Sequence, residues 1–233
     1  MTMIASAARG PKPIASFRHT AIVCAAVALS ALAGASAASG PLATGRLASP
    51  LTVYLPLIAA ESALVFAVWK AAIEPRRLSI AAFIGAPPAF MGLLRDAGIA
   101  AGMWAAWRIV PTALLGHGWL PASQAGSVQP LLPRTTLEMI AWGLLSISAG
   151  FAEELLFRGY LQRQFHALTR NAAAAVLMQA ALFGMAHGYQ GPASCIRITV
   201  YGVWFGAMAQ WRKSLVPGMI AHAWTDIAAG LLP

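Results

Sequence analysis

The sequence predicts an all-α protein, a polytopic membrane bundle of about seven transmembrane helices. Of its 233 residues, 59% are hydrophobic and 10% are charged, whereas soluble domains carry about 25% charged residues. The mean hydropathy is +0.68. Several windows also supply the roughly 20 consecutive apolar residues that a membrane-spanning helix needs. Because a surface so poor in charge cannot be covered by water-soluble groups, lipid is the expected solvent.

The charge balance indicates topology rather than a nucleic-acid partner. The chain has 16 Lys and Arg against 7 Asp and Glu, for a net charge of +9. Most of the basic residues separate apolar runs, where they orient membrane spans with their positive ends inside. We therefore expect the lipid bilayer as a partner and no nucleic acid. Cys24 and Cys195 lie inside apolar runs, which is typical of small core residues rather than of a disulfide framework.

The region 1–134 has generic membrane character. An apolar run at about 20–38 follows a basic head and ends in small residues, which fits either a membrane anchor or a cleavable signal peptide. The next span is expected at about 51–69. It contains Glu61 and precedes a basic, cytoplasmic loop.

The stretch after this loop is ambiguous, because Pro87-Pro88 and then Arg95-Asp96 interrupt its apolar runs. We predict one span at about 97–115, preceded by a broken or surface-lying segment. The Gly-, Pro- and Ser-rich segment 116–134 then predicts an outside loop.

The region 135–233 is predicted to be the catalytic membrane core. Thr135 and Glu138 have the spacing of a capping box, which marks a helix start. This helix should run toward Glu153 and end on the cytoplasmic side, where arginines follow. Three further spans are expected at about 172–187, 193–211 and 215–232.

Ionisable groups are concentrated in this core, although such groups are costly at membrane depth and are functional candidates by default. Glu154 and Arg158 have the i,i+4 spacing of an ion pair. Glu153 points about 100° away from Glu154 on a helix and has no such partner. It is therefore free to face a cavity and accept a proton. The alternative is that both acids pair with arginines at the membrane boundary.

Two histidines follow on later helices. His187 closes the run that begins at Phe183, and a satisfied interfacial histidine is the simpler interpretation of that position. His222 and Asp226 share one helix face. Asp226 therefore either accepts the imidazole N–H or joins His222 as a metal ligand, or the pair merely fastens the last helix.

Together these residues have the chemistry of water activation. A carboxylate and two imidazoles around one water can deprotonate it for attack on a carbonyl, directly or with a bound divalent metal such as zinc. The His–Asp pair or the metal would stabilise the oxyanion. Whether a cofactor is needed stays open. The reaction class that this constellation fits best is hydrolysis within the bilayer. The His-Glu-x-x-His signature of soluble metalloproteases is absent, and no serine lies in a Gly-x-Ser-x-Gly setting.

The three motifs, Glu153-Glu154-x-x-x-Arg158, Phe183-x-x-x-His187 and His222-x-x-x-Asp226, resemble those of the CAAX protease and bacteriocin-processing (CPBP, or Abi) family of intramembrane proteases. This family includes the type II CAAX prenyl endopeptidases. The resemblance covers about residues 137–232.

The resemblance implies an intramembrane endopeptidase, of metallo- or glutamate type, in which Glu153 and His187 activate water. Glu154, Arg158 and Phe183 would support the site. His222 and the last motif position would stabilise the oxyanion or bind a metal, so that His187, His222 and Asp226 are candidate ligands. That last position is commonly Asn in the prenyl endopeptidases. Asp226 departs from this pattern, since an ionised carboxylate cannot donate a hydrogen bond.

Three functional classes follow from these motifs. The first is an endopeptidase of the bacterial cytoplasmic membrane that cleaves a peptide or protein, which can itself be membrane-anchored. The second is a non-catalytic scaffold or bacteriocin-immunity protein of the same fold. The third, a proton-coupled transporter, is disfavoured because no matching pair of broken helices is visible in two halves. The endopeptidase requires Glu153 and His187 to lie at one depth, although a helix ending near Arg158 would separate them by about 22 Å.

Overall fold

The computed structural model describes residues 11–38, 49–85, 89–116 and 128–231, and every regular element in these ranges is helical. The longer helices are α1 (Phe17–Ala38), α2 (Leu51–Val68), α4 (Phe90–Gly116), α5 (Thr136–Glu153), α7 (Ala172–Ala186), α8 (Pro192–Arg212) and α9 (Val216–Leu231). The shorter ones are α3 (Ile80–Ile84), α6 (Gln162–Thr169), the π-helical turns η1 (Trp69–Ile73) and η5 (Glu154–Leu161), and the 3-10 turns η2 (Glu74–Arg76), η4 (Gln129–Leu131) and η6 (Gly188–Gln190).

The first helix of the region 135–233 starts where the sequence indicates. The Thr135 hydroxyl accepts a hydrogen bond from the Glu138 amide, and the Glu138 carboxylate accepts one from the Thr135 amide at 3.1 Å. This reciprocal pair is the expected capping box. The end of the helix differs from the prediction. α5, η5 and α6 form one continuous 34-residue helix that ends at Thr169. The helix can pass Arg158 because that side chain is paired inside the protein and does not need water.

The turn after α6 places the motif residues at one level. Arg170 adopts a left-handed conformation (φ 53°), ends α6 and lets the chain reverse into α7. Glu153 precedes Arg170 by 17 residues, and His187 follows it by 17. Because both arms rise about 1.5 Å per residue, the two side chains return to the same depth. The expected difference in depth between Glu153 and His187, which assumed a helix ending near Arg158, is therefore wrong.

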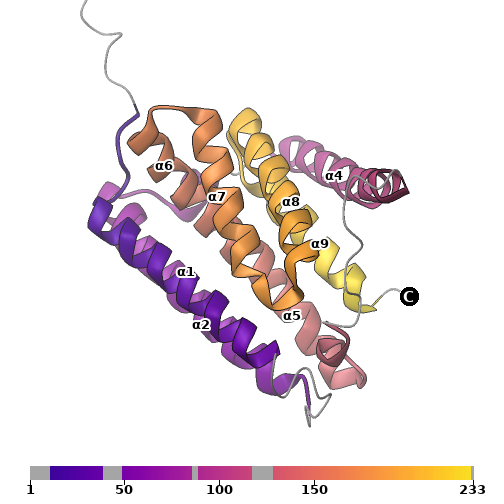
Figure 1. The fold of residues 1–233 in the computed structure, drawn as a ribbon. Coiled ribbons are helices and arrows are strands. Elements are labelled where there is room, and N and C mark those ends of the chain that lie inside the picture. Colours follow the sequence, from indigo (N-terminus) through magenta and orange to yellow (C-terminus); the bar gives the residue numbers. More distant parts are fainter. Residues whose placement is uncertain (1–10, 39–48, 86–88, 117–127, 232–233) are drawn as a thin grey trace, which may run out of the picture.

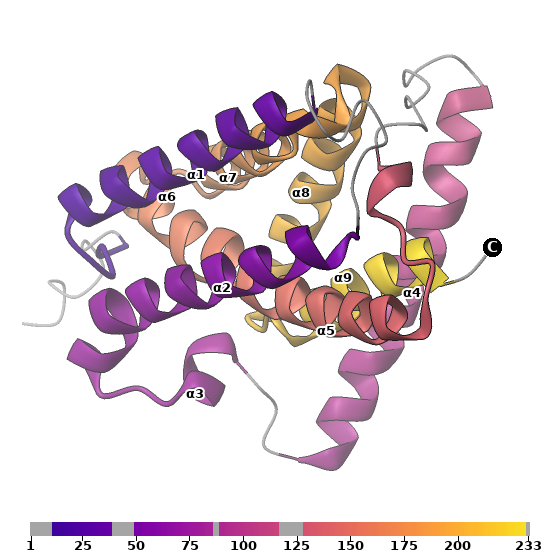
Figure 2. The same cartoon turned by 90° about the horizontal axis from the view of Figure 1, so that it is seen from below.

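Helices from the two regions of the chain enclose the site. α7 packs on α8, and α5 packs on α9 and α2, while α4 covers α9 from the other side (Figures 1 and 2). The approach of α5 to α9 depends on a glycine, because a Cβ at Gly150 would lie 2.7 Å from the Ala223 amide nitrogen. At Gly218, a Cβ would lie 2.9 Å from the Glu154 carboxylate. These glycines bring α9 close to the helix that carries both motif acids.

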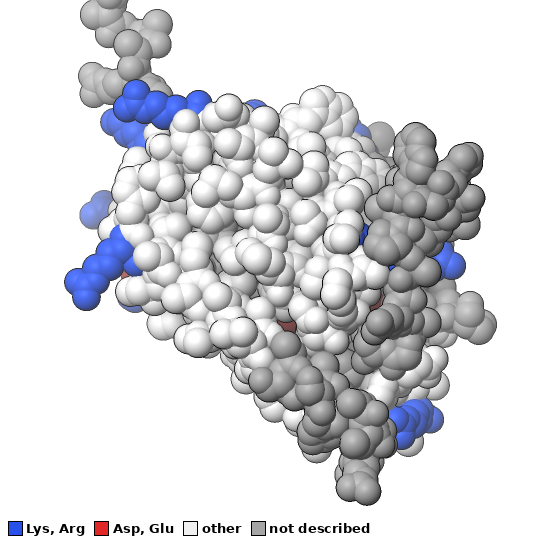
Figure 3. Space-filling model, in the orientation of Figure 1, with Lys and Arg blue, Asp and Glu red and all other residues white. Residues whose placement is uncertain are grey.

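Two helices are long and apolar enough to cross a membrane, residues 51–76 and 136–169 of the described chain. Only 11% of the first window is buried inside the protein, so its apolar side chains face outward. Figure 3 shows a broad face almost free of charged side chains, with blue Lys and Arg atoms mainly at its edges. Such a face suits lipid. The larger count of about seven spans stays a prediction, as does the division at residue 134.

α4 begins at Phe90 rather than at about residue 97. The residues expected to interrupt it are accommodated inside the helix, because Asp96 is fully buried and accepts a hydrogen bond from Arg212 at 2.5 Å. Pro87 and Pro88, like residues 117–127 of the predicted outside loop, lie outside the described residues.

α1 is joined to η5 and α6 by polar contacts. The Tyr160 hydroxyl lies 2.6 Å from the His19 ring nitrogen Nδ1 and 3.2 Å from the Thr20 hydroxyl. The Gln164 amide also donates to the Thr20 hydroxyl at 2.6 Å. These contacts favour the anchor interpretation of the first helix over a cleaved signal peptide, and retention of α1 stays a prediction.

Candidate active site

A cavity of about 310 Å³ brings together the four residues predicted to be catalytic. Glu153 comes from the end of α5, His187 from the end of α7, and His222 and Asp226 from successive turns of α9. The three motifs therefore converge, although His187 lies 34 positions after Glu153 and His222 another 35 positions after His187.

The first motif forms the expected ion pair. Arg158 Nη1 lies 2.9 Å from Glu154 Oε1, and neither side chain is more than 1% exposed. The Arg158 guanidinium also lies over the Phe183 ring, 4.3 Å from its centroid. A charge buried this deeply needs such partners, because an unpaired one would cost several kcal/mol. All eight residues of the π-helical turn η5 are buried, and π-helical turns are frequent at functional sites.

Glu154 also orients His222. The His222 ring nitrogen Nδ1 lies 3.1 Å from Glu154 Oε1, and a carboxylate paired with arginine can only accept the hydrogen bond. The other ring nitrogen, Nε2, lies 3.6 Å from Glu153 and 3.7 Å from Asp226. The sequence left open whether Asp226 accepts a hydrogen bond from His222, and at this distance that hydrogen bond does not form. Glu154 takes that role, and Asp226 flanks the nitrogen that faces the cavity.

His187 is held in one orientation. Its Nδ1 lies 2.9 Å from the Phe183 carbonyl oxygen, which can only accept, so Nδ1 carries the hydrogen. In the neutral ring, Nε2 then keeps its lone pair for a water or a substrate. Phe183 thus contributes its carbonyl to His187 and its ring to Arg158, and its ring centroid is 4.8 Å from that of His187. Any residue could supply this carbonyl, but the ring contacts with Arg158 and His187 need an aromatic side chain.

Glu153 has the free acceptor that water activation requires. Its side chain is 23% exposed, and its oxygen Oε2 is buried without a hydrogen-bond partner among the described residues. Since this carboxylate lines the cavity, an added water can meet it there.

Glu61 and Tyr189 are among the cavity-lining residues that the motifs do not include. Glu61 of α2 accepts a hydrogen bond from the Ser148 hydroxyl at 2.6 Å and lies in the same cavity as Glu153. The sequence contained a clue to Glu61 as a site residue, because an acid inside an apolar span is a functional candidate. Tyr189, in the turn η6, also lines the cavity. Burial raises the pKa of its phenol to about 12, so it remains a hydrogen-bond donor. No sequence pattern marks Tyr189.

The metal-ligand alternative finds no support in the geometry. His187, His222 and Asp226 share the cavity, yet no three His, Cys, Asp or Glu side chains within the described ranges are placed to hold a metal ion. We therefore derive no step through a metal.

Comparison with known proteins bears on this site directly. Residues 135–228 match the family model "Type II CAAX prenyl endopeptidase Rce1-like". No curated protein and no solved structure gives a match to the chain. All seven predicted site residues lie within the matched region, whereas Glu61 lies outside it. The family resemblance seen in the motifs is confirmed.

Proposed function

From the match of residues 135–228 to the Rce1-like protease family, we propose that this membrane protein is an endopeptidase that hydrolyses a peptide bond with a glutamate-activated water. The observation that carries the proposal is the convergence of Glu153, His187 and His222 on one cavity, with an unpartnered carboxylate oxygen and two oriented imidazoles.

The water is held between Glu153 and His187 in this proposal. It donates one hydrogen bond to Glu153 and the other to the Nε2 lone pair of His187. As the water oxygen attacks the carbonyl carbon of the substrate, Glu153 accepts the proton. Glu153 then returns that proton to the nitrogen of the departing amine as the C–N bond breaks. The carboxylate is thereby regenerated.

His222 is the proposed donor to the oxyanion. In its imidazolium form it carries hydrogens on both ring nitrogens, with Nδ1–H held by Glu154 at 3.1 Å. Nε2–H then faces the cavity, where it can donate to the developing charge on the carbonyl oxygen. Glu153 and Asp226, at 3.6 and 3.7 Å from Nε2, balance the charge of the imidazolium. Asp226 is therefore a positioning residue here rather than a donor.

Glu154, Arg158 and Phe183 act through the two histidines. Arg158 keeps Glu154 as a fixed acceptor for His222, and the Phe183 carbonyl fixes His187. Holding reacting groups in one geometry is a large part of enzymatic rate enhancement. We expect Glu61, which shares the cavity, to modulate the charge around Glu153.

The experiment compares wild type with Glu153→Gln and His187→Ala, each purified in detergent. The probes are peptides with C-terminal CAAX sequences, farnesylated and unmodified, together with a mixed peptide library, and products are identified by mass spectrometry. We expect wild type to cleave at least one probe and both variants to lose cleavage, with helix content and melting temperature nearly unchanged.

Glu74→Gln is the matched control, because Glu74 pairs with Lys70 on the exposed surface and does not line the cavity. It should cleave at the wild-type rate. Full cleavage by Glu153→Gln would reject the role of this carboxylate. Peptide binding without any cleavage by wild type would favour the non-catalytic scaffold.

A further inference from the structure

One end of the helix bundle collects basic residues. At this end α1 starts, and α2 with its extension η2, the helix that finishes in α6, and α8 all end. Polar contacts tie the segments together there, because Arg76 donates to the Pro13 carbonyl at 3.0 Å and Gln164 accepts a hydrogen bond from the Ile14 amide at 2.7 Å. Six basic residues lie in or just after η2, α6 and α8, namely Arg76, Arg77, Arg163, Arg170, Arg212 and Lys213. We call this the basic end.

The opposite end, here called the far end, is where α2 and α5 start and α9 finishes. The Ser49 hydroxyl donates to the Glu138 carboxylate at 2.8 Å, and the Trp142 indole N–H donates to the Asp226 carbonyl at 2.8 Å. In the described segments that lead into α2 and α5, residues 49–50 and 128–135, Arg134 is the one basic residue. Since basic loops stay on the cytoplasmic side of a membrane, the far end faces outward.

The cavity that holds Glu153 extends toward the far end. The other α5 residues that line it all precede Glu153, back to Trp142, which lies about 16 Å away along the helix axis. α2 lines it with residues between Val53 and Glu61, all from the half of the helix nearer the far end. Leu131 of η4, just before α5, also lines it. Glu153 therefore lies at the inner limit of this space.

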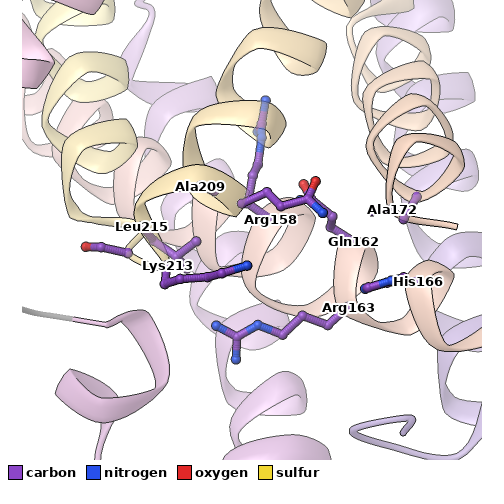
Figure 4. Close-up of a pocket in the computed structure, with 11 residues that line it drawn as sticks. Arg158, Gln162, Arg163, His166, Ala172, Ala209, Lys213 and Leu215 are labelled. Atoms are coloured by element: carbon purple, nitrogen blue, oxygen red, sulfur yellow. The ribbon is translucent and has the colours of Figure 1, made fainter. Parts of the chain in front are cut away.

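Close packing separates Glu153 from the basic end. All eight residues of η5, which follows Glu153, are buried. Among them, neither side chain of the Glu154–Arg158 pair is more than 1% exposed. A second cavity, of about 280 Å³, does lie at the basic end, where Figure 4 shows Arg163 and Lys213. Among the described residues, none lines both cavities. A peptide that approached from the basic end would have to displace this buried turn.

We propose that the peptide substrate reaches Glu153 from the outer side of the membrane, through the far end of the cavity. The substrate class is therefore an exported peptide or the outer segment of a membrane-anchored protein. Leu57, Leu131, Trp142 and Leu145 line the way to Glu153 and suit apolar side chains of that segment. The word substrate rests on the proposed proteolysis, whereas the side of entry follows from the fold and the charges.

The test measures reagent access rather than cleavage, so it does not depend on proteolysis. Both native cysteines are free thiols and are first replaced by serine in the full chain. Single cysteines are then introduced, and intact bacterial cells that express each variant are treated with a charged, membrane-impermeant methanethiosulfonate before or after permeabilisation. Thiols that escaped the reagent are measured, after denaturation, by the mass shift with a polyethylene glycol maleimide.

Five positions are compared. Glu153→Cys and Ser146→Cys place the thiol in the cavity. Ala152→Cys is the matched control, because Ala152 is the neighbour of Glu153 but is buried and does not line the cavity. Arg134→Cys and Arg170→Cys, at exposed positions of the far end and the basic end, report which side each end faces.

In intact cells, we expect Glu153→Cys, Ser146→Cys and Arg134→Cys to react at least tenfold faster than Arg170→Cys, which should react only after permeabilisation. Ala152→Cys should stay unreactive in both conditions. If Glu153→Cys does not fold, Ser146→Cys, which exchanges one oxygen for sulfur, still carries the test. The proposal is overturned if the folded cavity variants react only after permeabilisation or not at all, or if Ala152→Cys reacts as they do. Cleavage by purified wild type would stand in that case, and labelling from outside of a protein that cleaves no peptide would instead reject the proteolysis.

Discussion

Replacing the buried ion pair of Glu154 and Arg158 separates its structural role from its catalytic one. We consider three variants, Glu154→Met, Arg158→Met and the double variant. Each single variant leaves one charge without its partner at a site no more than 1% exposed. Removing one partner of a buried pair destabilises a protein by about 3–5 kcal/mol. The double variant leaves no unpaired charge and fills a similar volume with apolar atoms. It should therefore unfold within about 1–2 kcal/mol of wild type, since such replacements are often neutral.

Activity should not follow stability in the double variant. Without Glu154, the Nδ1–H of His222 loses its acceptor at 3.1 Å. Loss of a group that orients an active-site histidine typically costs 10- to 100-fold. We therefore expect kcat/KM to fall by about 10- to 100-fold although folding is restored.

The assay has two measurements on the same preparations. Circular dichroism monitors unfolding as SDS is added to the protein in detergent, and a second measurement gives the rate of peptide cleavage. The exposed pair of Lys70 and Glu74 provides the control cycle. Its replacement by two methionines should change stability by about 0–1 kcal/mol and leave cleavage unchanged. Wild-type cleavage by the Glu154→Met/Arg158→Met variant would refute the orienting role of Glu154. Equal destabilisation in both single variants and the double variant would refute the burial argument.

Three other predictions concern Asp226, the α5–α9 contact and metals. Asp226→Asn should retain most of the cleavage, because an amide of the same shape still flanks Nε2 of His222, which lies 3.7 Å from the present carboxylate, whereas Asp226→Ala should lower kcat/KM; equal activity in both variants would mean that this position does not act through His222. Gly150→Ala should lower stability by about 1–3 kcal/mol, because the new Cβ would lie 2.7 Å from the Ala223 amide nitrogen, and thermal unfolding should show no such loss for Gly143→Ala, whose Cβ would meet no atom within 4 Å. Cleavage should persist after dialysis against a chelator and should not rise with added zinc; activity that disappears with the chelator and returns with zinc would overturn the glutamate-activated route.

Contacts within one helix were accessible to sequence reasoning. The capping box of Thr135 and Glu138 and the ion pair of Glu154 and Arg158 both form as predicted. The residues of each pair are three or four positions apart, where helical geometry alone brings them together. The three motifs also identified the residues that meet in the cavity.

Contacts between helices were not accessible in the same way. His222 was paired with Asp226 on its own helix as one alternative, but its hydrogen bond goes to Glu154 on η5. The sequence predicts that Asp96 interrupts an apolar run, but Arg212 of α8 neutralises it. In each case the partner is more than 60 positions away. Helical periodicity carries no information about such a partner.

The sequence by itself determined that this chain is helical, suited to lipid, and equipped with acids and histidines in three ordered motifs. These properties follow from composition and from spacings within single helices. Only the tertiary structure decided that the Glu153 helix continues past Arg158, that Glu61 and Tyr189 join the cavity, and that this cavity extends away from the basic end. The physical reason is that these features depend on how closely helices approach. That approach is decided at contacts such as Gly150 against Ala223, between residues distant in the chain.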